Sequence, residues 1–297
     1  MELQTGLRSG TITSFAGGGL REAACVLFVA QSEDGWLVVT DRSPFHPVSL
    51  SWPDQPGDRG WLTLADGRRL AVLDSCEGLV NRLTGLLATG EAARALKRFD
   101  PDLAAVVLHV VEAAPLVGEA VTLDVDPRFR EALSLQHTGV HLAALALNRC
   151  AAPFWTKDPQ DLDALGAPNL DKTAIEHSEI GPEGSTDRYR LGKSLRKKGF
   201  DAAGFLADLP RHVATMNATL RQMLHSPAPV RITPGEGPLG DRRLWSTTLD
   251  GVVASMPCGG THIADLSDLA GIEVTLAPTE DGFVLHSRSS PAARKSV

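Results

Sequence analysis

The sequence predicts an α+β protein of two domains, a small β-barrel over residues 1–125 and an α/β domain over residues 126–297. Three observations support this fold class. Short runs rich in Val and Leu alternate with turn residues through the first domain. A long pattern of apolar residues at helical spacing begins directly after Asp126-Pro127. Strand patterns return from Val230 onward.

The expected strands of the N-terminal domain share apolar, partly alternating residues bounded by Gly, Pro or Asp. They are 24–30, 36–40, 60–64, 69–74, 104–111 and 120–124. Asp66-Gly67, between two of these strands, is typical of a hairpin turn. Leucines at helical spacing predict a helix over Gly78–Lys97. Several short strands with one helix indicate a small barrel.

The C-terminal domain is expected to begin with a helix over 129–147, capped by Asp126. The polar residues 153–184 are then expected to form loops. Asp201 should cap a further helix, which Pro210 should break or kink. The last elements are expected as strands at 230–232, 245–249, 252–256, 272–277 and 283–287, with a short helix at 266–270.

Composition limits the compartment and the partners. Hydrophobic residues make up 43% and charged residues 22% of the chain, which is ordinary for a globular protein. No apolar run approaches the ~20 residues that cross a bilayer, and the first residues lack the pattern of a secretory signal. We therefore expect a cytoplasmic protein with no membrane partner. The net charge of −7 argues against a broad, non-specific nucleic-acid binder.

Two pairs of potential metal ligands stand out in the sequence. His137 and His141 lie four residues apart in an apolar-periodic run, so they share one face of a helix. Cys258 and His262 repeat this spacing much later in the chain. Together the pairs offer three imidazole nitrogens and one thiolate, a tetrahedral set suited to Zn²⁺. The alternative for the first pair alone is two hydrogen-bonded core histidines.

The residues around these pairs resemble a known family. Ser134–Leu142 (SLQHTGVHL) and Cys258–His262 (CGGTH) are similar to the editing domain of alanyl-tRNA synthetases and to the free-standing alanyl-tRNA editing proteins of the AlaX type. Upstream, Gln55–Gly60 (QPGDRG) resembles the Q-P-x-D-x-G segment of that family's N-terminal barrel. The three segments stand in the family order, and the resemblance covers nearly the whole chain in fragments.

The sequence departs from the family pattern in two places. Ser49–Asp54 stands where the family usually has a glycine-rich approach to the glutamine. A long segment, 153–199, lies between the two metal pairs and has no counterpart in the pattern. Both departures bear on the substrate rather than on the metal.

The resemblance implies a Zn²⁺-dependent deacylase that hydrolyses, in trans, the ester bond of misacylated tRNA. The expected amino acid is serine or glycine on alanine tRNA, or a threonine-like or non-standard residue such as fluorothreonine. The four ligand residues would hold the zinc, and a metal-activated water would be the nucleophile; alternatively, zinc orients the substrate. Gln55, Thr138 and Thr261 are candidate catalytic residues that orient the reactants, although Gln136 and Thr138 could equally be helix-surface residues.

Other functions remain open on the sequence. A zinc protease is disfavoured, because Thr138 stands where that class places a glutamate base. A closed set of four protein ligands is also the form of a purely structural zinc site. The chain could further be a zinc-dependent hydrolase of a small ester or amide, or a zinc-stabilised tRNA-binding module without activity.

The segment Arg188–Lys198 (RYRLGKSLRKK) is strongly basic, with six basic residues in eleven positions. These are Arg188, Arg190, Lys193, Arg196, Lys197 and Lys198. Six positive charges would neutralise phosphates near the aminoacylated acceptor end of tRNA, giving affinity that falls steeply with salt. The alternative is a solvated loop face balanced by Asp187 and Asp201.

Overall fold

The computed structural model describes residues 1–293 and has a mixed α+β fold richer in strand than in helix, which confirms the α+β class. The chain divides into two compact units. The first consists of residues 1–131, 232–244 and 257–261, and the second of residues 132–231, 245–256 and those from 262 onward. Within the described residues, no helix is long and apolar enough to cross a membrane.

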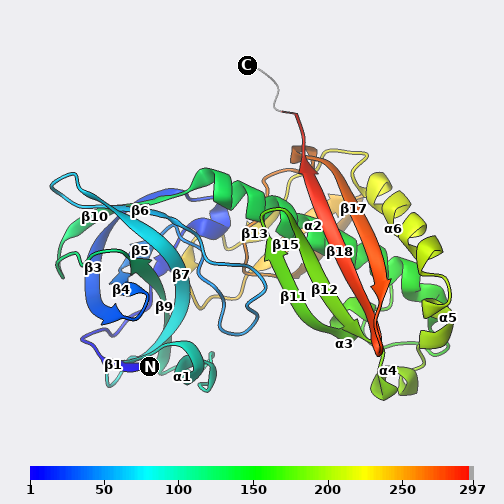
Figure 1. The fold of residues 1–297 in the computed structure, drawn as a ribbon, viewed down its shortest axis with the longest axis horizontal. Coiled ribbons are helices and arrows are strands. Elements are labelled where there is room, and N and C mark those ends of the chain that lie inside the picture. The colour runs from blue at the N-terminus through cyan, green and yellow to red at the C-terminus, as the bar shows by residue number, and fades with distance from the viewer. Residues whose placement is uncertain (294–297) are drawn as a thin grey trace. The chain divides into compact units, whose positions relative to one another are not determined.

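The first unit is built mainly from strands (Figure 1). Its elements are β1 (Glu2–Gln4), β2 (Ile12–Thr13), η1 (Phe15–Gly17), β3 (Arg21–Ser32), β4 (Gly35–Thr40), β5 (Arg42–Ser43), β6 (Gly60–Thr63), β7 (Arg69–Asn81), β8 (Leu86–Ala88), α1 (Gly90–Arg94), β9 (Leu103–Val111), β10 (Ala120–Val125) and β14 (Gly237–Pro238). Eight strands form one sheet in the order β1-β8-β7-β6-β10-β3-β4-β9, and β9 pairs in addition with β7. The strands β14, β2 and β5 form a separate small sheet.

Strand burial in the first unit follows the sequence pattern. The continuous apolar run of β9 is buried from Ala104 to Val111, as expected for a strand covered on both faces. In β10 the buried side chains alternate with partly exposed ones. The Asp66-Gly67 turn is confirmed, because Gly67 has a φ of +86° and the Leu64 N–H donates to the Arg68 carbonyl at 2.8 Å.

The helix predicted over Gly78–Lys97 is wrong. These residues continue β7, form β8 and leave only the five-residue helix α1. Leu79 and Leu87, whose spacing indicated a helix, are buried in strands. β7 pairs with β9 along its length, so that Leu79 lies opposite Ala105. Pairing between distant strands thus outweighs the local spacing.

The second unit combines helices with an antiparallel sheet in the order β11-β12-β18-β17, visible in Figure 1. A further sheet has the order β13-β15-β16. The elements from residue 127 onward, apart from β14, are α2 (Pro127–Ala151), η2 (Ala152–Phe154), α3 (Leu170–Ala174), β11 (Ile175–Gly181), β12 (Gly184–Arg190), α4 (Lys193–Lys197), α5 (Ala202–Leu206), α6 (Leu209–Met223), β13 (Arg231–Thr233), β15 (Leu244–Leu249), β16 (Val252–Pro257), η3 (Leu266–Asp268), β17 (Leu269–Pro278) and β18 (Gly282–Pro291).

Two predictions for this part of the chain need correction. Residues 153–184 are not all loop, because they contain α3 and β11. The strands there are polar, yet β12 alternates, with Ser185, Asp187 and Tyr189 buried. The short helix expected at 266–270 is the 3₁₀ turn η3, and Leu269 already begins β17.

Helix boundaries follow the capping residues. Asp126 Oδ1 accepts from the N–H groups of Arg128 and Phe129 at 2.9 and 3.3 Å, which confirms it as the cap of α2. Asp201 caps α5 through the N–H of Gly204 at 3.0 Å. Pro210 separates α5 from α6, since it lies in the first turn of α6, where a missing N–H costs little.

Candidate metal centre

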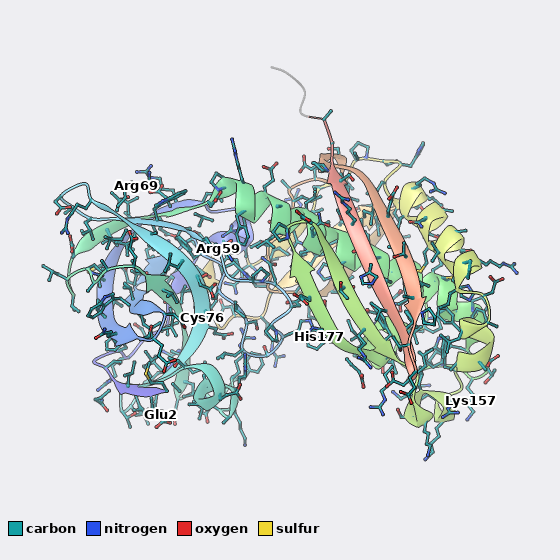
Figure 2. All side chains as sticks on the ribbon, viewed as in Figure 1. Glu2, Arg59, Arg69, Cys76, Lys157 and His177 are labelled. Atoms are coloured by element: carbon teal, nitrogen blue, oxygen red, sulfur yellow. The ribbon has the colours of Figure 1, made fainter. Side chains whose placement is uncertain are left out.

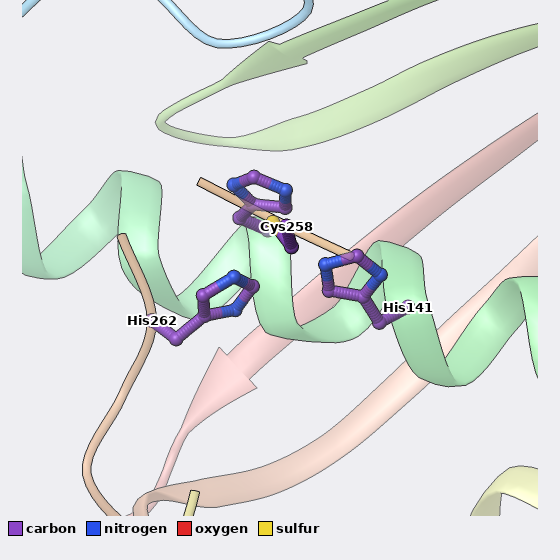
Figure 3. Close-up of side chains that lie close together, drawn as sticks. His141, Cys258 and His262 are labelled. Atoms are coloured by element: carbon purple, nitrogen blue, oxygen red, sulfur yellow. The ribbon is translucent and has the colours of Figure 1, made fainter. Parts of the chain in front are cut away.

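Four potential metal ligands gather beside α2. His137, His141, Cys258 and His262 each offer one ligand atom, and these atoms all lie within 4.8 Å of one another. Figure 3 shows His141, Cys258 and His262 close together at the helix. The two pairs that the sequence singled out are therefore brought together, as expected for one shared ion.

The spacing on α2 places two of the ligands. His137 and His141 stack one turn apart, with ring centroids 5.0 Å from each other. The ring of His262 lies 4.4 Å from that of His137 and 4.9 Å from that of His141. Trp245 of β15 is fully buried and packs on His141 at 5.0 Å. The three imidazoles thus form a compact group with an apolar wall on one side.

Anchoring of α2 to β18 holds this group in place. The Gln136 carboxamide accepts from the N–H of Ser289 at 2.8 Å and donates to its carbonyl at 3.0 Å. At Gly139, a Cβ would lie 2.0 Å from Ser289 Oγ, so a larger residue would push against the strand. Gln136 and Thr138 are both buried, which excludes the alternative that they are helix-surface residues.

The chemistry of these side chains fits a zinc ion. His141 Nε2 is buried without a hydrogen-bond partner, an arrangement that costs free energy unless another group supplies the missing contact. Burial lowers the pKa of His141 to about 4, so its imidazole is neutral and offers a lone pair. Three imidazoles with a thiol offer the nitrogen and sulfur ligands that Zn²⁺ prefers.

The thiol of Cys258 is held protonated by its surroundings when no ion is bound. Its pKa is raised to about 12, mainly by burial; a hydrogen bond from the Gly260 N–H lowers it, and the nearby Asp54 carboxylate makes a smaller contribution that raises it. That N–H lies 3.4 Å from Sγ. Metal binding would therefore release the thiol proton.

Thr138 orients one of the histidines. Its hydroxyl donates to the Ser134 carbonyl at 2.9 Å within α2. The same oxygen lies 3.2 Å from His262 Nδ1 and accepts from the N–H of Ile263 at 3.3 Å. Because the single hydroxyl proton is used on Ser134, His262 Nδ1 must carry a proton and donate it to Thr138. Its Nε2 then carries the lone pair that would bind a metal ion, as in many metal sites where a neighbour fixes the histidine tautomer.

Gln55 and Thr261 bind each other in the first unit. Gln55 donates from Nε2 to Thr261 Oγ1 at 2.9 Å and accepts from the Thr261 N–H at 3.3 Å. Both residues are buried. The Cys258 N–H donates to the Arg243 carbonyl at 3.1 Å. These bonds hold the segment that carries Cys258 at both of its ends.

Asp54 is a residue near the site that the sequence did not single out. It is partly buried, and burial raises its pKa to about 6. Its charge acts on the Cys258 thiol, so it lies close to a proposed ligand. The signal was its position directly before Gln55, where the chain departs from the glycine-rich family pattern.

The six basic residues separate into two groups. Arg188 pairs with Asp281 at 3.4 Å, and Arg190 pairs with Glu176 at 3.2 Å and with Asp281 at 3.4 Å. The other four, on α4 and directly after it, are exposed: Lys193, Arg196, Lys197 and Lys198. The expected counter-charge Asp187 is instead buried, and Asp201 caps α5.

The sequence matches no model of a known protein family and no curated protein sequence. The segments 55–60, 134–142 and 258–262 therefore carry the resemblance to the alanyl-tRNA editing family by themselves.

Proposed function

We propose that this protein is a zinc-dependent deacylase that hydrolyses misacylated tRNA in trans. The observation that carries the proposal is the grouping of three imidazoles and one thiol within 4.8 Å. The substrate class comes from the segments around those ligands, which resemble the alanyl-tRNA editing family. The pairing of β9 with both β4 and β7 supports the small barrel that the same resemblance implies.

Hydrolysis of an aminoacyl ester needs an activated water, stabilisation of the developing oxyanion and a proton for the leaving ribose hydroxyl. A zinc ion in such a site supplies Lewis acidity, which polarises a carbonyl and acidifies water. The chain itself supplies the ligands His137, His141, Cys258 and His262. Thr138 fixes the tautomer of His262.

The buried side chains of Gln55, Thr138 and Thr261 act in this proposal by positioning. Their polar atoms bind neighbouring protein groups, so each holds a ligand or the segment that bears one. Gly259, next to Cys258, is exposed, and an added Cβ there would meet nothing within 4 Å. Glycine there allows close approach of a ligand to the backbone.

The test is deacylation of a panel of aminoacyl-tRNAs by the zinc-loaded protein. We expect release of a hydroxyl-bearing or small amino acid from mismatched tRNA, loss of turnover with a chelator and recovery when Zn²⁺ is restored. A matched pair of variants separates ligand loss from misfolding. Cys258→Ser should lose both zinc and turnover, whereas Cys25→Ser, at a distant cysteine in β3, should keep both.

Two other outcomes would assign a different function. Metal-dependent turnover of a small ester together with inert aminoacyl-tRNA would favour a small-molecule hydrolase. Zinc removal that unfolds the protein, with no turnover by the loaded form, would favour a structural zinc in a tRNA-binding module. Either result refutes the deacylase.

A further inference from the structure

The short helix α4 presents cations on its exposed side. Leu195 is buried within the helix and Phe200 just beyond it, each about 2% exposed. Lys193, Arg196 and Lys197 are exposed, and so is Lys198 at the helix end. The apolar residues therefore fix the segment to the unit and leave the charges in solvent.

Lys157 joins these cations from a distant part of the sequence. Trp155 pairs with Phe200 in an isolated antiparallel bridge, and the Thr156 N–H donates to the Gly199 carbonyl at 2.7 Å. Lys157 Nζ, labelled by residue in Figure 2, donates to the Lys197 carbonyl at 3.0 Å. Gly199 has a φ of +100°, and a Cβ there would lie 2.8 Å from Lys157 Cβ. The glycine thus lets the Lys157 side chain lie against the end of α4.

The charges of this surface are not neutralised by ion pairs. Among residues 1–293, none of the ion pairs within 4 Å includes Lys157 or any of the four cations of α4 and its end. The Asp161 carboxylate already pairs with Lys172 at 2.8 Å, which lowers the pKa of Asp161, and the charge of Lys198 only helps to lower it. Asp158, adjacent to Lys157 in the sequence, offsets one charge at most.

We infer that these five cations form the surface that contacts tRNA phosphates, and that Arg188 and Arg190 do not. The five residues, named here the α4 cationic surface, are Lys157, Lys193, Arg196, Lys197 and Lys198. The inference rests on the proposed function for its partner. Unpaired, solvated cations release counterions from a polyanion when they bind it, whereas Arg188 and Arg190 would first have to leave carboxylates.

The experiment measures the affinity of the zinc-loaded protein for deacylated tRNA at several salt concentrations. Each lost phosphate contact lowers the slope of log affinity against log salt by about 0.7–0.9. Replacing all five residues by Ala should lower it by about 3.5–4.5 if all five bind phosphate. Lys197→Ala with Lys198→Ala should lower it by about 1.4–1.8, and Arg188→Ala with Arg190→Ala should leave it unchanged.

Three results in the tRNA assay would overturn the inference, and a fourth comes from a different ligand. The three are an unchanged slope in the five-residue variant, an equal loss in the Arg188/Arg190 variant, and no binding of tRNA by the wild-type protein. If the five-residue variant still binds tRNA like the wild type but loses binding to an acidic peptide, the surface would be assigned to a protein partner, which would also refute the inference. Thermal unfolding of each variant checks that the fold is retained.

Hydrolysis of a serine ester of adenosine separates this inference from the proposed function. The five-residue variant should cleave this small ester at the wild-type rate, because the surface contacts only the tRNA body. A wild-type protein that binds tRNA through the surface but cleaves no ester would refute the deacylase and leave the surface standing. A protein that deacylates tRNA but whose salt slope is unchanged by all five substitutions would support the deacylase and refute the α4 cationic surface.

Discussion

Replacement of Thr138 by Val removes the hydroxyl that orients His262 while keeping the shape of the side chain. In the wild type this hydroxyl lies 3.2 Å from His262 Nδ1 and 3.3 Å from the N–H of Ile263. The substitution leaves both donors without that acceptor, at about 1–3 kcal/mol each. Loss of an outer-shell partner typically weakens metal binding about 10- to 100-fold, or about 1.4–2.7 kcal/mol.

Competition with a fluorescent chelator at neutral pH measures the predicted change in zinc affinity. Thr138→Val should bind zinc about 10- to 100-fold more weakly than the wild type. Thr138→Ser keeps the hydroxyl and should restore most of the affinity, and nitrogen NMR of His262 should show the proton on Nδ1 in both the wild type and this variant. Wild-type affinity in Thr138→Val, or equal loss in Thr138→Ser, would refute the orienting role.

Two further predictions concern stability. Asp58 and Arg130 form a buried ion pair, with the Arg130 Nε 2.9 Å from Asp58 Oδ1. Asp58→Asn leaves the buried guanidinium without its counter-charge, so it should lower the free energy of unfolding measured with denaturant by about 3–5 kcal/mol. Asp66→Asn, in an exposed pair, is the control and should leave stability almost unchanged. Similar losses in both variants would contradict the prediction. Burial lowers the pKa of His109 to about 4. The unfolded state therefore binds a proton before the folded state does, so stability should be full above pH ~6.5 and fall by up to about 3 kcal/mol as the pH drops from about 6.5 to about 4. His109→Gln should flatten this pH dependence, and an unchanged pH profile in that variant would assign the effect elsewhere.

Local signals in the sequence predict α2 and its ligands well. Asp126 is followed by a long apolar period, and capping together with periodicity acts within one or two turns. The spacing of His137 and His141 is also local, because residues four apart share a helix face. To predict that these histidines lie close to Cys258 and His262, the second pair had to be recognised by its own spacing and by its flanking residues.

Long-range pairing explains what the sequence did not predict. Leu79 and Leu87 have helical spacing, but their partners lie on β9 and β1, which local patterns do not reveal. The neutralisation of Arg188 depends on Asp281, and the contribution of Lys157 to the α4 cationic surface depends on a backbone contact to Lys197. A count of basic residues along the chain therefore includes two that are already paired and omits one that is not.

The grip of Gln136 on Ser289 has a mechanical consequence. Gln136, which directly precedes the proposed ligand His137, bonds to the main chain of the last strand, β18. The C-terminal hairpin therefore stabilises the position of the helix from which two imidazoles project. Damage to that contact, for instance by shortening β18, would reach the ion-binding group without removing any atom that touches the ion. A substitution in β18, far from the ligands in sequence, would in this way weaken metal binding while all four ligand residues are still present.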